Sequence, residues 1–409
     1  MRRSVVVAGR GLLCSLGDDA AKVHAALCAG ESGLGKIGLF DTTPLANPIG
    51  GEIRGFDPKS YLGKKNMRPL DRTARLVTTA THLALQDSGW TAEGRAAQEV
   101  GLVLGTIWGS VRTIAEFDRH AVQEGPSYAS ALDFANTVIN AAAGQTAIWH
   151  NLRGVNSTVA TGQTSGLRAI AYAAGFIESG RTDVLLAGGA EELCMESFVS
   201  LERAGFVAPA GSQEPVPFGG ARKGFLPGEG AGLLVLESAE LAARRGARVL
   251  ARVLGYGDSF DPERGRSEAR SIEAAARAIG AALTAAGLGP DALGAVSASG
   301  NGGPLDALEA KGLAAALGRK AATLPITAIK AGLGETLGAD GGLQGVLALE
   351  TLLKGEQPGI RGLQRPEPEF PFPLAGARPQ RLAGRAILLY SMGWDGQHCA
   401  VVISGPPES

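Results

Sequence analysis

The chain has 409 residues, of which 45% are apolar, and a formal net charge of −1. This composition fits one large compact α/β unit and argues against nucleic-acid binding, while the lack of any run of about 18 apolar residues argues against a membrane span. There is no charged-then-apolar leader, and the four cysteines show no C-x-x-C spacing, so we expect a cytoplasmic protein with reduced thiols.

Strand-like and helical patterns alternate along the chain. Glycine-bounded runs predict strands at 5–9, 100–105, 182–189, 232–237, 249–257, 292–300, 325–329, 385–391 and 399–404. Helical patterns cover 73–88, 139–150, 169–179, 271–286 and 305–317. The alternation predicts mostly parallel sheets buried on both faces, in two similar halves at residues 1–245 and 246–409, with a surface loop at 361–380.

Residues 154–170 read G-V-N-S-T-V-A-T-G-Q-T-S-G-L-R-A-I and form the most informative segment. A β-branched run ends in small residues and leads into an alanine-rich helical pattern, which is the arrangement that activates a nucleophilic thiol at a helix N-terminus. Gln163 stands at the tip of this turn, and its amide forms hydrogen bonds but has no ionisable proton. The segment therefore predicts a nucleophile site without its nucleophile.

This segment resembles the pattern G-P-N-x-S-V-x-T-A-C-A-T-G of the β-ketoacyl-acyl-carrier-protein synthases, with Gln163 at the position of their acyl-bearing cysteine. Residues 5–11, 205–206 and 218–237 resemble further blocks of the family in the same order, so the resemblance runs nearly end to end. It implies a dimer of thiolase-like five-layer αβαβα subunits, in which each half supplies one sheet. The five histidines are scattered, so we expect neither a metal nor a cofactor.

The two histidines of the family are also replaced. Ser299 occupies the first position, in S-A-S-G-N-G-G-P-L-D, and Glu335 occupies the second, in K-A-G-L-G-E, where Lys330 is kept. Condensation in this family needs a thiolate and two imidazoles, whereas serine donates one neutral hydrogen bond and a carboxylate repels the enolate oxygen. We expect Gln163, Ser299, Glu335 and Lys330 to be vestigial, no residue to be catalytic, and Lys330 and Glu335 to form a buried ion pair.

These three replacements resemble the chain length factors of type II polyketide synthases. The resemblance implies a non-catalytic subunit that pairs with a cysteine-bearing ketosynthase, shapes the tunnel for the growing chain during malonyl-based elongation, and works with an acyl carrier protein. Two alternatives remain: a glutamine-type malonyl-carrier-protein decarboxylase, although such enzymes are expected to retain both histidines, or an acyltransferase with relocated chemistry at a residue such as Cys194. The acidic and apolar neighbours of Cys194 would raise its thiol pKa.

Residues 105–117 begin with a glycine turn and continue as a short helix in which Val111, Ile114 and Phe117 share one face. The resemblance implies that this helix lies at the dimer interface and that its bulky side chains close the tunnel. The alternative is an ordinary core-facing helix. Trp108 is a further candidate for the tunnel wall.

Trp394 lies in G-W-D-G-Q-H, which resembles the G-F-G-G-T-N pattern whose phenylalanine gates the thiol in the family. Because tryptophan is bulkier and an aspartate follows it, we expect Trp394 to plug the site rather than to swing.

Lys64, Lys65 and Arg68 form a basic cluster. The resemblance implies a docking patch for the acidic carrier protein, since charge complementarity raises encounter rates. A solvated surface cluster is the alternative.

Overall fold

The computed structural model describes residues 2–64, 66–212, 214–221, 223–264, 266–364 and 378–406. Its ten main strands fall into two groups of five with the same order and the same relative directions. In spatial order the first group holds β5 (Asn156–Val159), β4 (Gly101–Gly105), β6 (Val184–Glu191), β7 (Gly230–Ser238) and β1 (Val5–Cys14). The second holds β10 (Ile326–Thr327), β9 (Leu293–Ser297), β13 (Ala386–Met392), β14 (Gln397–Ser404) and β8 (Ala251–Phe260).

The prediction of mostly parallel sheets is wrong. Among the described strands, β4 is parallel to β5 and β6, and β9 is parallel to β10 and β13, whereas the other neighbours in both groups are antiparallel. One cause is local, because only residues 393–396 join β13 to β14, and so short a connection cannot hold a crossover helix. The two groups meet where Val5–Val7 of β1 pairs with Ala251–Val253 of β8, so hydrogen bonding continues from one half-sheet into the other.

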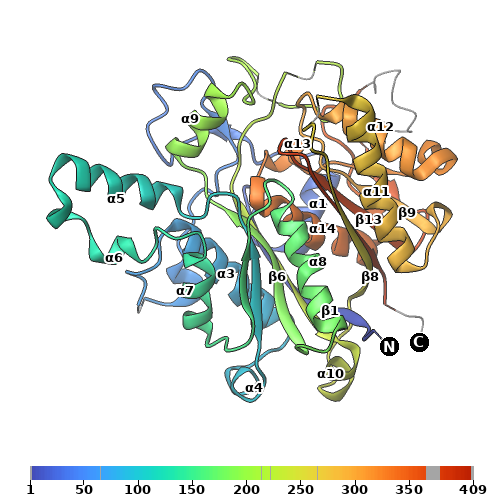
Figure 1. Cartoon of the computed structure of the whole chain (residues 1–409), viewed down its shortest axis with the longest axis horizontal. Coiled ribbons are helices and arrows are strands. Elements are labelled where there is room, and N and C mark those ends of the chain that lie inside the picture. The colour runs from blue at the N-terminus through green and yellow to red at the C-terminus, as the bar shows by residue number, and fades with distance from the viewer. Residues whose placement is uncertain are drawn as a thin grey trace.

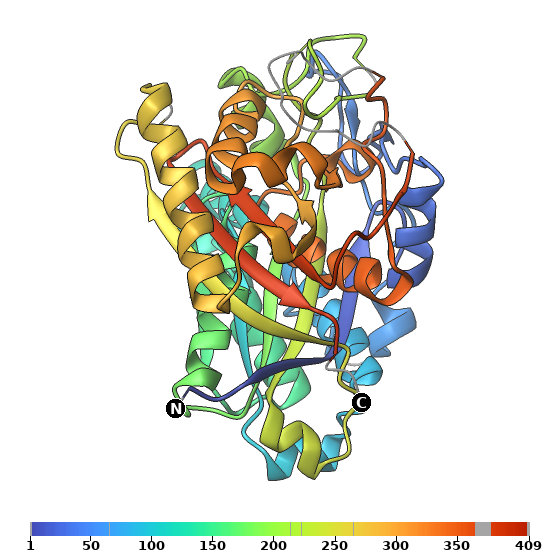
Figure 2. The same cartoon turned by 90° about the vertical axis from the view of Figure 1, so that its right-hand side faces the viewer.

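Helices separate and cover the two half-sheets, which gives the expected five-layer αβαβα fold (Figures 1 and 2). The central layer contains α8 (Ser165–Glu178) and α14 (Asp340–Lys354), which contact strands of both groups. On the outer face of the first group lie α3 (Arg72–Asp87) and α7 (Ala141–His150). On the outer face of the second lie α11 (Glu268–Ala286) and α12 (Asp306–Leu317).

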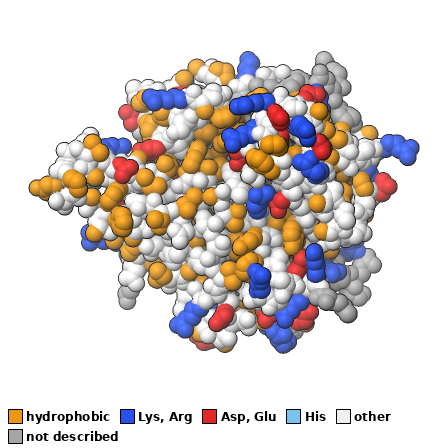
Figure 3. Space-filling view, in the orientation of Figure 1, with side chains coloured by type: hydrophobic (Ala, Val, Ile, Leu, Met, Phe, Trp, Pro, Cys, Tyr) orange, Lys and Arg blue, Asp and Glu red, His pale blue; other side chains and the backbone are white. Residues whose placement is uncertain are grey.

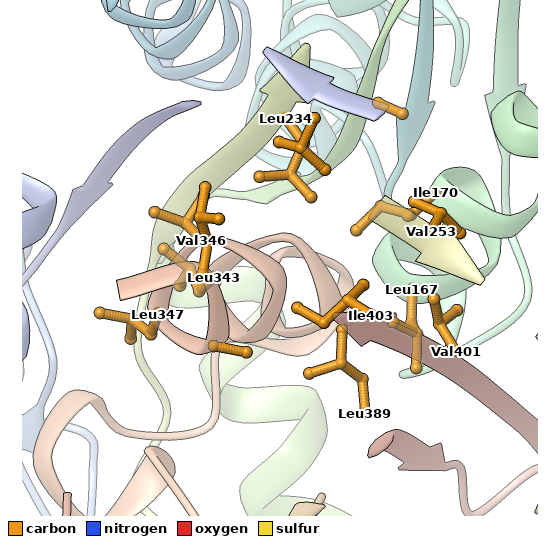
Figure 4. Packing of buried hydrophobic residues seen from close by; sticks show 14 of the residues in the cluster. Leu167, Ile170, Leu234, Val253, Leu343, Val346, Leu347, Leu389, Val401 and Ile403 are labelled. Carbon is orange, nitrogen blue, oxygen red and sulfur yellow. The ribbon is translucent and has the colours of Figure 1, made fainter. Parts of the chain in front are cut away.

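The main hydrophobic core surrounds the central helices. Leu167 of α8 and Leu343 of α14 pack with Leu234 of β7 and Leu389 of β13, and all four side chains are buried (Figure 4). Burial of each such side chain contributes about 1.5–3 kcal/mol. The helix backbone itself approaches the sheet, since a Cβ at Gly342 would lie 2.1 Å from a backbone oxygen of β7. Only glycine permits this contact.

The remaining elements are short or peripheral. They are α1 (Ala20–Cys28), α2 (Lys59–Leu62), α4 (Ala92–Ala97), α5 (Val111–Gln123), α6 (Ala131–Phe134), α9 (Met195–Arg203), α10 (Ala239–Arg244), α13 (Lys330–Leu333), four 3₁₀ turns (Pro126–Tyr128, Pro290–Ala292, Gly318–Thr323 and Leu337–Ala339) and two small strand pairs, β2 (Gly35–Lys36) with β3 (Ile49–Gly50) and β11 (Glu356–Gln357) with β12 (Gln380–Arg381). Helices α5 and α6 form an arm that projects from the body (Figure 1). In the described part of the chain no helix is both long and apolar enough to span a bilayer.

Candidate functional site

The predicted nucleophile turn lies between β5 and α8. Gly162 has φ of +59°, a left-handed conformation that favours glycine, and the next residue is Gln163. Ser165 fixes the turn, because its Oγ accepts from the Thr161 backbone N–H at 2.9 Å and donates to the Gly162 carbonyl at 2.6 Å. The turn therefore holds Gln163 immediately before α8, and its side chain is only 2% exposed.

Both ends of the Gln163 amide have partners. Nε2 donates to Oε2 of Glu335 at 2.8 Å, and Oε1 accepts from the backbone N–H of Trp394 at 3.3 Å. Ser391 adds a hydrogen bond from its Oγ to the Gln163 carbonyl at 3.3 Å. The side chain thus ties the turn before α8 to the 393–396 turn and to the loop that carries Glu335.

Glu335 accepts four hydrogen bonds although it is fully buried. Besides Gln163, its donors are Asn301 Nδ2 at 2.7 Å, Lys330 Nζ at 3.0 Å and the Leu337 backbone N–H at 2.9 Å. The Lys330–Glu335 ion pair expected from the sequence is therefore present, with side chains 1% and 0% exposed. Sequence reasoning missed Asn301, which lies two residues beyond Ser299 on the same loop.

Lys330 is the centre of this network. Its Nζ also lies 3.2 Å from Oδ2 of Asp340 and donates to Oγ of Ser299 at 3.2 Å. Burial alone would lower the pKa of Lys330, but the carboxylates of Asp340 and Glu335 raise it above its ordinary value. The structure thus brings Gln163, Ser299, Lys330 and Glu335 into one buried network.

Further carboxyl groups surround the same lysine. Glu309 accepts from the Ser299 backbone N–H at 2.6 Å, and Asp306 accepts from the backbone N–H groups of Phe218, Asn301 and Gly302. Burial raises the pKa of Glu309 to about 8 and that of Asp340 to about 7. One lysine thus faces several buried carboxyl groups. Because their pKa values are raised, Glu309 and Asp340 are at least partly protonated near neutral pH.

Aromatic side chains close the space next to Gln163. The ring of Trp394 stacks on Phe206, with centroids 4.7 Å apart, and lies 6.3 Å from the ring of Phe225. The cavity that they leave beside Gln163 measures about 20 Å³, which is room for about one water molecule. Trp108 belongs to the same cluster. An acyl chain has no space here in this conformation.

The thiols offer no replacement nucleophile. Burial and then the charge of Glu192 raise the pKa of Cys194 to about 12, and burial likewise raises the pKa of Cys14 to about 12 and of Cys28 to about 11. The pKa of Cys399 is also raised by burial. All four thiols therefore stay protonated at neutral pH, which disfavours chemistry relocated to Cys194.

The helix predicted after residue 109 is α5, and it is longer than expected. Val111, Ile114 and Phe117 are half-buried, so they are neither core residues nor free surface residues. The Phe117 ring lies 5.8 Å from that of Phe134 on α6. These side chains belong to the projecting arm rather than to the Gln163 network.

The basic cluster borders a surface hollow of about 820 Å³. Lys64 and Arg68 line it together with an apolar set made of Leu62, Met67, Pro69, Leu70, Ile148 and Trp149. Lys65, the third residue of the cluster, lies outside the described residues. The hollow thus combines positive charge with apolar side chains.

Family models identify the chain. Residues 2–242 match the N-terminal domain of the β-ketoacyl synthases, and residues 250–364 match their C-terminal domain. The chain belongs to the β-ketoacyl synthase family. It is similar to 3-oxoacyl-(acyl-carrier-protein) synthase 2 of Vibrio cholerae, with 33% identity over 376 residues that cover 90% of each chain. The corresponding protein of Vibrio harveyi is 31% identical over 98% of each chain.

Solved structures agree with this assignment. The ishigamide ketosynthase/chain length factor superposes with a TM-score of 0.90 and 28% identity over the whole of both chains. A β-ketoacyl synthase from Burkholderia phymatum STM815 gives a TM-score of 0.91 at 24% identity, which supports the fold. Within this synthase family, the chain has Gln163, Ser299 and Glu335 where the family resemblance predicts a cysteine and two histidines.

Proposed function

We propose that the chain is a non-catalytic subunit, similar to a chain length factor, that pairs with a cysteine-bearing ketosynthase and shapes the tunnel for the growing polyketide chain. The Gln163–Glu335–Lys330 network carries this proposal. It supports the proposal because Gln163, which takes the nucleophile position in the family resemblance, is an amide, and because its partner Glu335 is a buried carboxylate where condensation would require a hydrogen-bond donor. A ketosynthase-type site that is filled in this way serves as structure, and the chemistry comes from the partner.

The same network argues against the decarboxylase alternative. Decarboxylation of a malonyl group needs free donors for the enolate oxygen. Here the Trp394 backbone N–H is bound to Gln163, and Gln163, Asn301 and Lys330 all donate to Glu335. The three N–H groups of Lys330 are taken by Glu335, Ser299 and Asp340, and one N–H of each amide is bound to Glu335, so an enolate would compete with Glu335 for these donors.

The arm and the neighbouring sheet edge support pairing. Val122, Tyr128 and Phe134 on the arm are 85%, 71% and 63% exposed, and Ile148 on α7 is 78% exposed. Hydrophobic side chains gather along the arm in Figure 3, and β5 stands at the open edge of the sheet. Exposed apolar surface beside an open strand edge is typical of a protein–protein interface.

Co-expression with a cysteine-bearing ketosynthase tests the pairing. We expect a one-to-one heterodimer in native mass spectrometry, and a lone chain that is poorly soluble or forms a weak homodimer. Phe134→Asp should weaken the heterodimer, whereas Leu353→Asp, at a side chain 42% exposed on α14, should leave it intact. A stable homodimer that does not exchange with the ketosynthase would rule out this proposal.

We also propose that Lys64, Arg68 and the adjoining hollow help to guide an acyl carrier protein to the complex. A basic rim around apolar side chains is complementary to an acidic amphipathic partner. Lys64→Ala with Arg68→Ala should reduce carrier affinity of the heterodimer at low salt, while the exposed Lys354→Ala should not. Equal carrier affinity for all variants would mean that Lys64 and Arg68 are only a solvated surface cluster.

Two further proposals concern the domain division and the localisation of the protein. We place the division between the two halves near residue 245, and we place the protein in the cytoplasm, in line with four cysteines that form no disulfide.

A further inference from the structure

Glu191 is a buried carboxylate outside the Gln163 network. It ends β6, is 1% exposed and accepts hydrogen bonds from four donors in two separate loops. From the loop after β4 come Thr106 Oγ1 at 3.0 Å, the Ile107 N–H at 2.6 Å and the Trp108 N–H at 3.1 Å. The fourth donor is the Gly338 N–H at 3.3 Å.

The two loops lead to different parts of the tunnel region. The first carries Trp108 and runs directly into α5, whereas the second follows Glu335 and carries Leu337. Trp108 and Leu337 meet Trp394 in one cluster. Glu191 is thus the shared attachment point of a candidate tunnel wall and of the filled site.

The second loop needs this support. Leu337 has φ of +56°, a left-handed conformation that is uncommon for a branched side chain. Its N–H is held by Glu335, and the next N–H, that of Gly338, is held by Glu191. The packing is tight, because a Cβ at Gly338 would lie 2.5 Å from Oε2 of Glu191 and 2.7 Å from Cα of Thr106.

We propose that Glu191 is a positioning residue that fixes Trp108 and the start of α5 relative to the Gln163–Glu335 network, and that it thereby sets the tunnel wall. The second clause rests on the proposed function, whereas the first does not. An ionised carboxylate offers enough acceptor sites for four donors. Burial raises the pKa of Glu191 to about 7, while the Ile107 and Trp108 amides act to lower it.

Glu191→Gln tests the inference, because glutamine keeps the shape but presents one oxygen and an NH₂ group that faces donors. Glu192→Gln is the matched control. Glu192 is the next residue and 2% exposed, but the one hydrogen bond found for it in the described chain comes from the Arg112 N–H at 3.3 Å. Thr106→Val removes one of the four donors to Glu191, together with the acceptor of the Gly109 N–H, and serves as a milder variant if Glu191→Gln does not fold.

Amide hydrogen exchange of the heterodimer measures how firmly Glu191 holds the two loops. Glu191→Gln should speed exchange at residues 105–109 and 336–339 together, on the order of tenfold or more for lost bonds to a charged group. Glu192→Gln should leave residues 336–339 unchanged, and Thr106→Val should loosen the first segment alone. Unchanged exchange of both segments in Glu191→Gln would overturn the inference. Faster exchange across the whole chain would overturn it as well.

Analysis of product lengths tests the two parts of the proposal separately, namely that Glu191 positions the two loops and that it sets the tunnel wall. With loosened loops and intact pairing, Glu191→Gln should broaden the distribution of product lengths. Unchanged lengths in the same preparation would overturn the tunnel-wall clause. Failure of the unmodified chain to pair at all would instead refute the proposed function, and the same exchange comparison on the lone chain would then decide whether Glu191 positions the two loops.

Discussion

Both ends of the Gln163 amide are hydrogen-bonded, and these partners would be the neighbours of a thiol at the same position. A cysteine there would lie beside the Glu335 carboxylate, which now accepts from Gln163 at 2.8 Å. A neighbouring carboxylate raises a thiol pKa and so lowers its reactivity. Gln163→Cys alone is therefore expected neither to condense malonyl units nor to react readily with an alkylating reagent.

Alkylation by iodoacetamide at pH 7.5, followed by mass spectrometry, measures this effect. Gln163→Cys/Glu335→Gln provides the control, because it keeps the burial and removes the charge. We expect the double variant to react on the order of tenfold faster, which corresponds to a thiol pKa shift of about one unit. Equal rates would show that Glu335 does not control this position.

Lys330 neutralises two buried carboxylates, so its removal should be costly. Lys330→Met leaves Glu335 and Asp340 without the cation that lies 3.0 and 3.2 Å away, and loss of one partner in a buried pair costs about 3–5 kcal/mol. The exposed pair Arg277–Glu273 is the control, since Arg277→Met should change the free energy of unfolding by roughly 0–1 kcal/mol. Similar urea midpoints for the two variants would contradict the assigned role.

Glu309 makes stability depend on pH. Its pKa is about 8 in the fold because of burial, against an ordinary value near 4.3 in the unfolded chain. Unfolding therefore releases a proton between these values, and the free energy of unfolding falls as pH rises. The stabilising contribution is fully present below about pH 4 and is lost as pH passes about 8.

The free energy of unfolding should be measured between pH 6.5 and 8.5. Burial lowers the pKa of His150 and His398 to about 4, so below about pH 6.5 these residues act in the opposite direction. In the chosen window the unmodified protein should lose stability with rising pH, and Glu309→Gln should lose about 1–2 kcal/mol less. Parallel curves for the two proteins would refute this account.

The sequence predicts part of this site. The replaced catalytic positions were recognisable because Gln163, Ser299 and Glu335 lie in ordered motifs. Glu309 and Glu191 were not, since a carboxylate on a helix or at a strand end is usually solvated. Their burial depends on tertiary packing, which no local pattern encodes.

Helices and strands differ in how well the sequence predicts them. The helix α8 is alanine-rich and was expected, although it begins at Ser165 rather than at residue 169. The helix α14 was missed because it is buried on nearly every side for its first three turns and has two glycines directly after Asp340, so it shows no alternation of polar and apolar faces that would reveal a helical period. These strands were expected, but their antiparallel directions were missed because the direction of a strand depends on its connections and not on its composition.

The element-scale prediction concerns α5. Ile114→Ala or Phe117→Ala in the heterodimer should open space of a few methylene groups, which a packed interior registers. We expect longer products with condensation intact. Asp118→Ala, at an exposed polar residue of the same helix outside the apolar surface proposed for pairing, should leave product length unchanged.

Product masses from carrier-bound intermediates check this prediction. If Ile114→Ala and Phe117→Ala assemble normally and give the original length, α5 does not set the length. Trp108 and Trp394, which lie in one aromatic cluster, would then be the next candidates.

At the scale of the whole molecule, the filled site lies where the two halves meet. Gln163 follows β5, and Lys330 follows β10, which is the equivalent strand of the second group. Trp394 joins them from the turn between β13 and β14. The repeated topology thus preserves the place of a ketosynthase site, while the side chains in it hold the halves together.

Under the proposed function, the partner carries out the chemistry and this chain serves as structure. The most direct measurement is condensation of malonyl-carrier protein by the lone chain, by the heterodimer, and by heterodimers with either Gln163→Ala or the partner's cysteine replaced by alanine. We predict no turnover above a heat-killed control for the lone chain, activity for the heterodimer with or without Gln163→Ala, and none without the partner's cysteine. Turnover by the lone chain, or activity that survives loss of the partner's cysteine, would contradict the account.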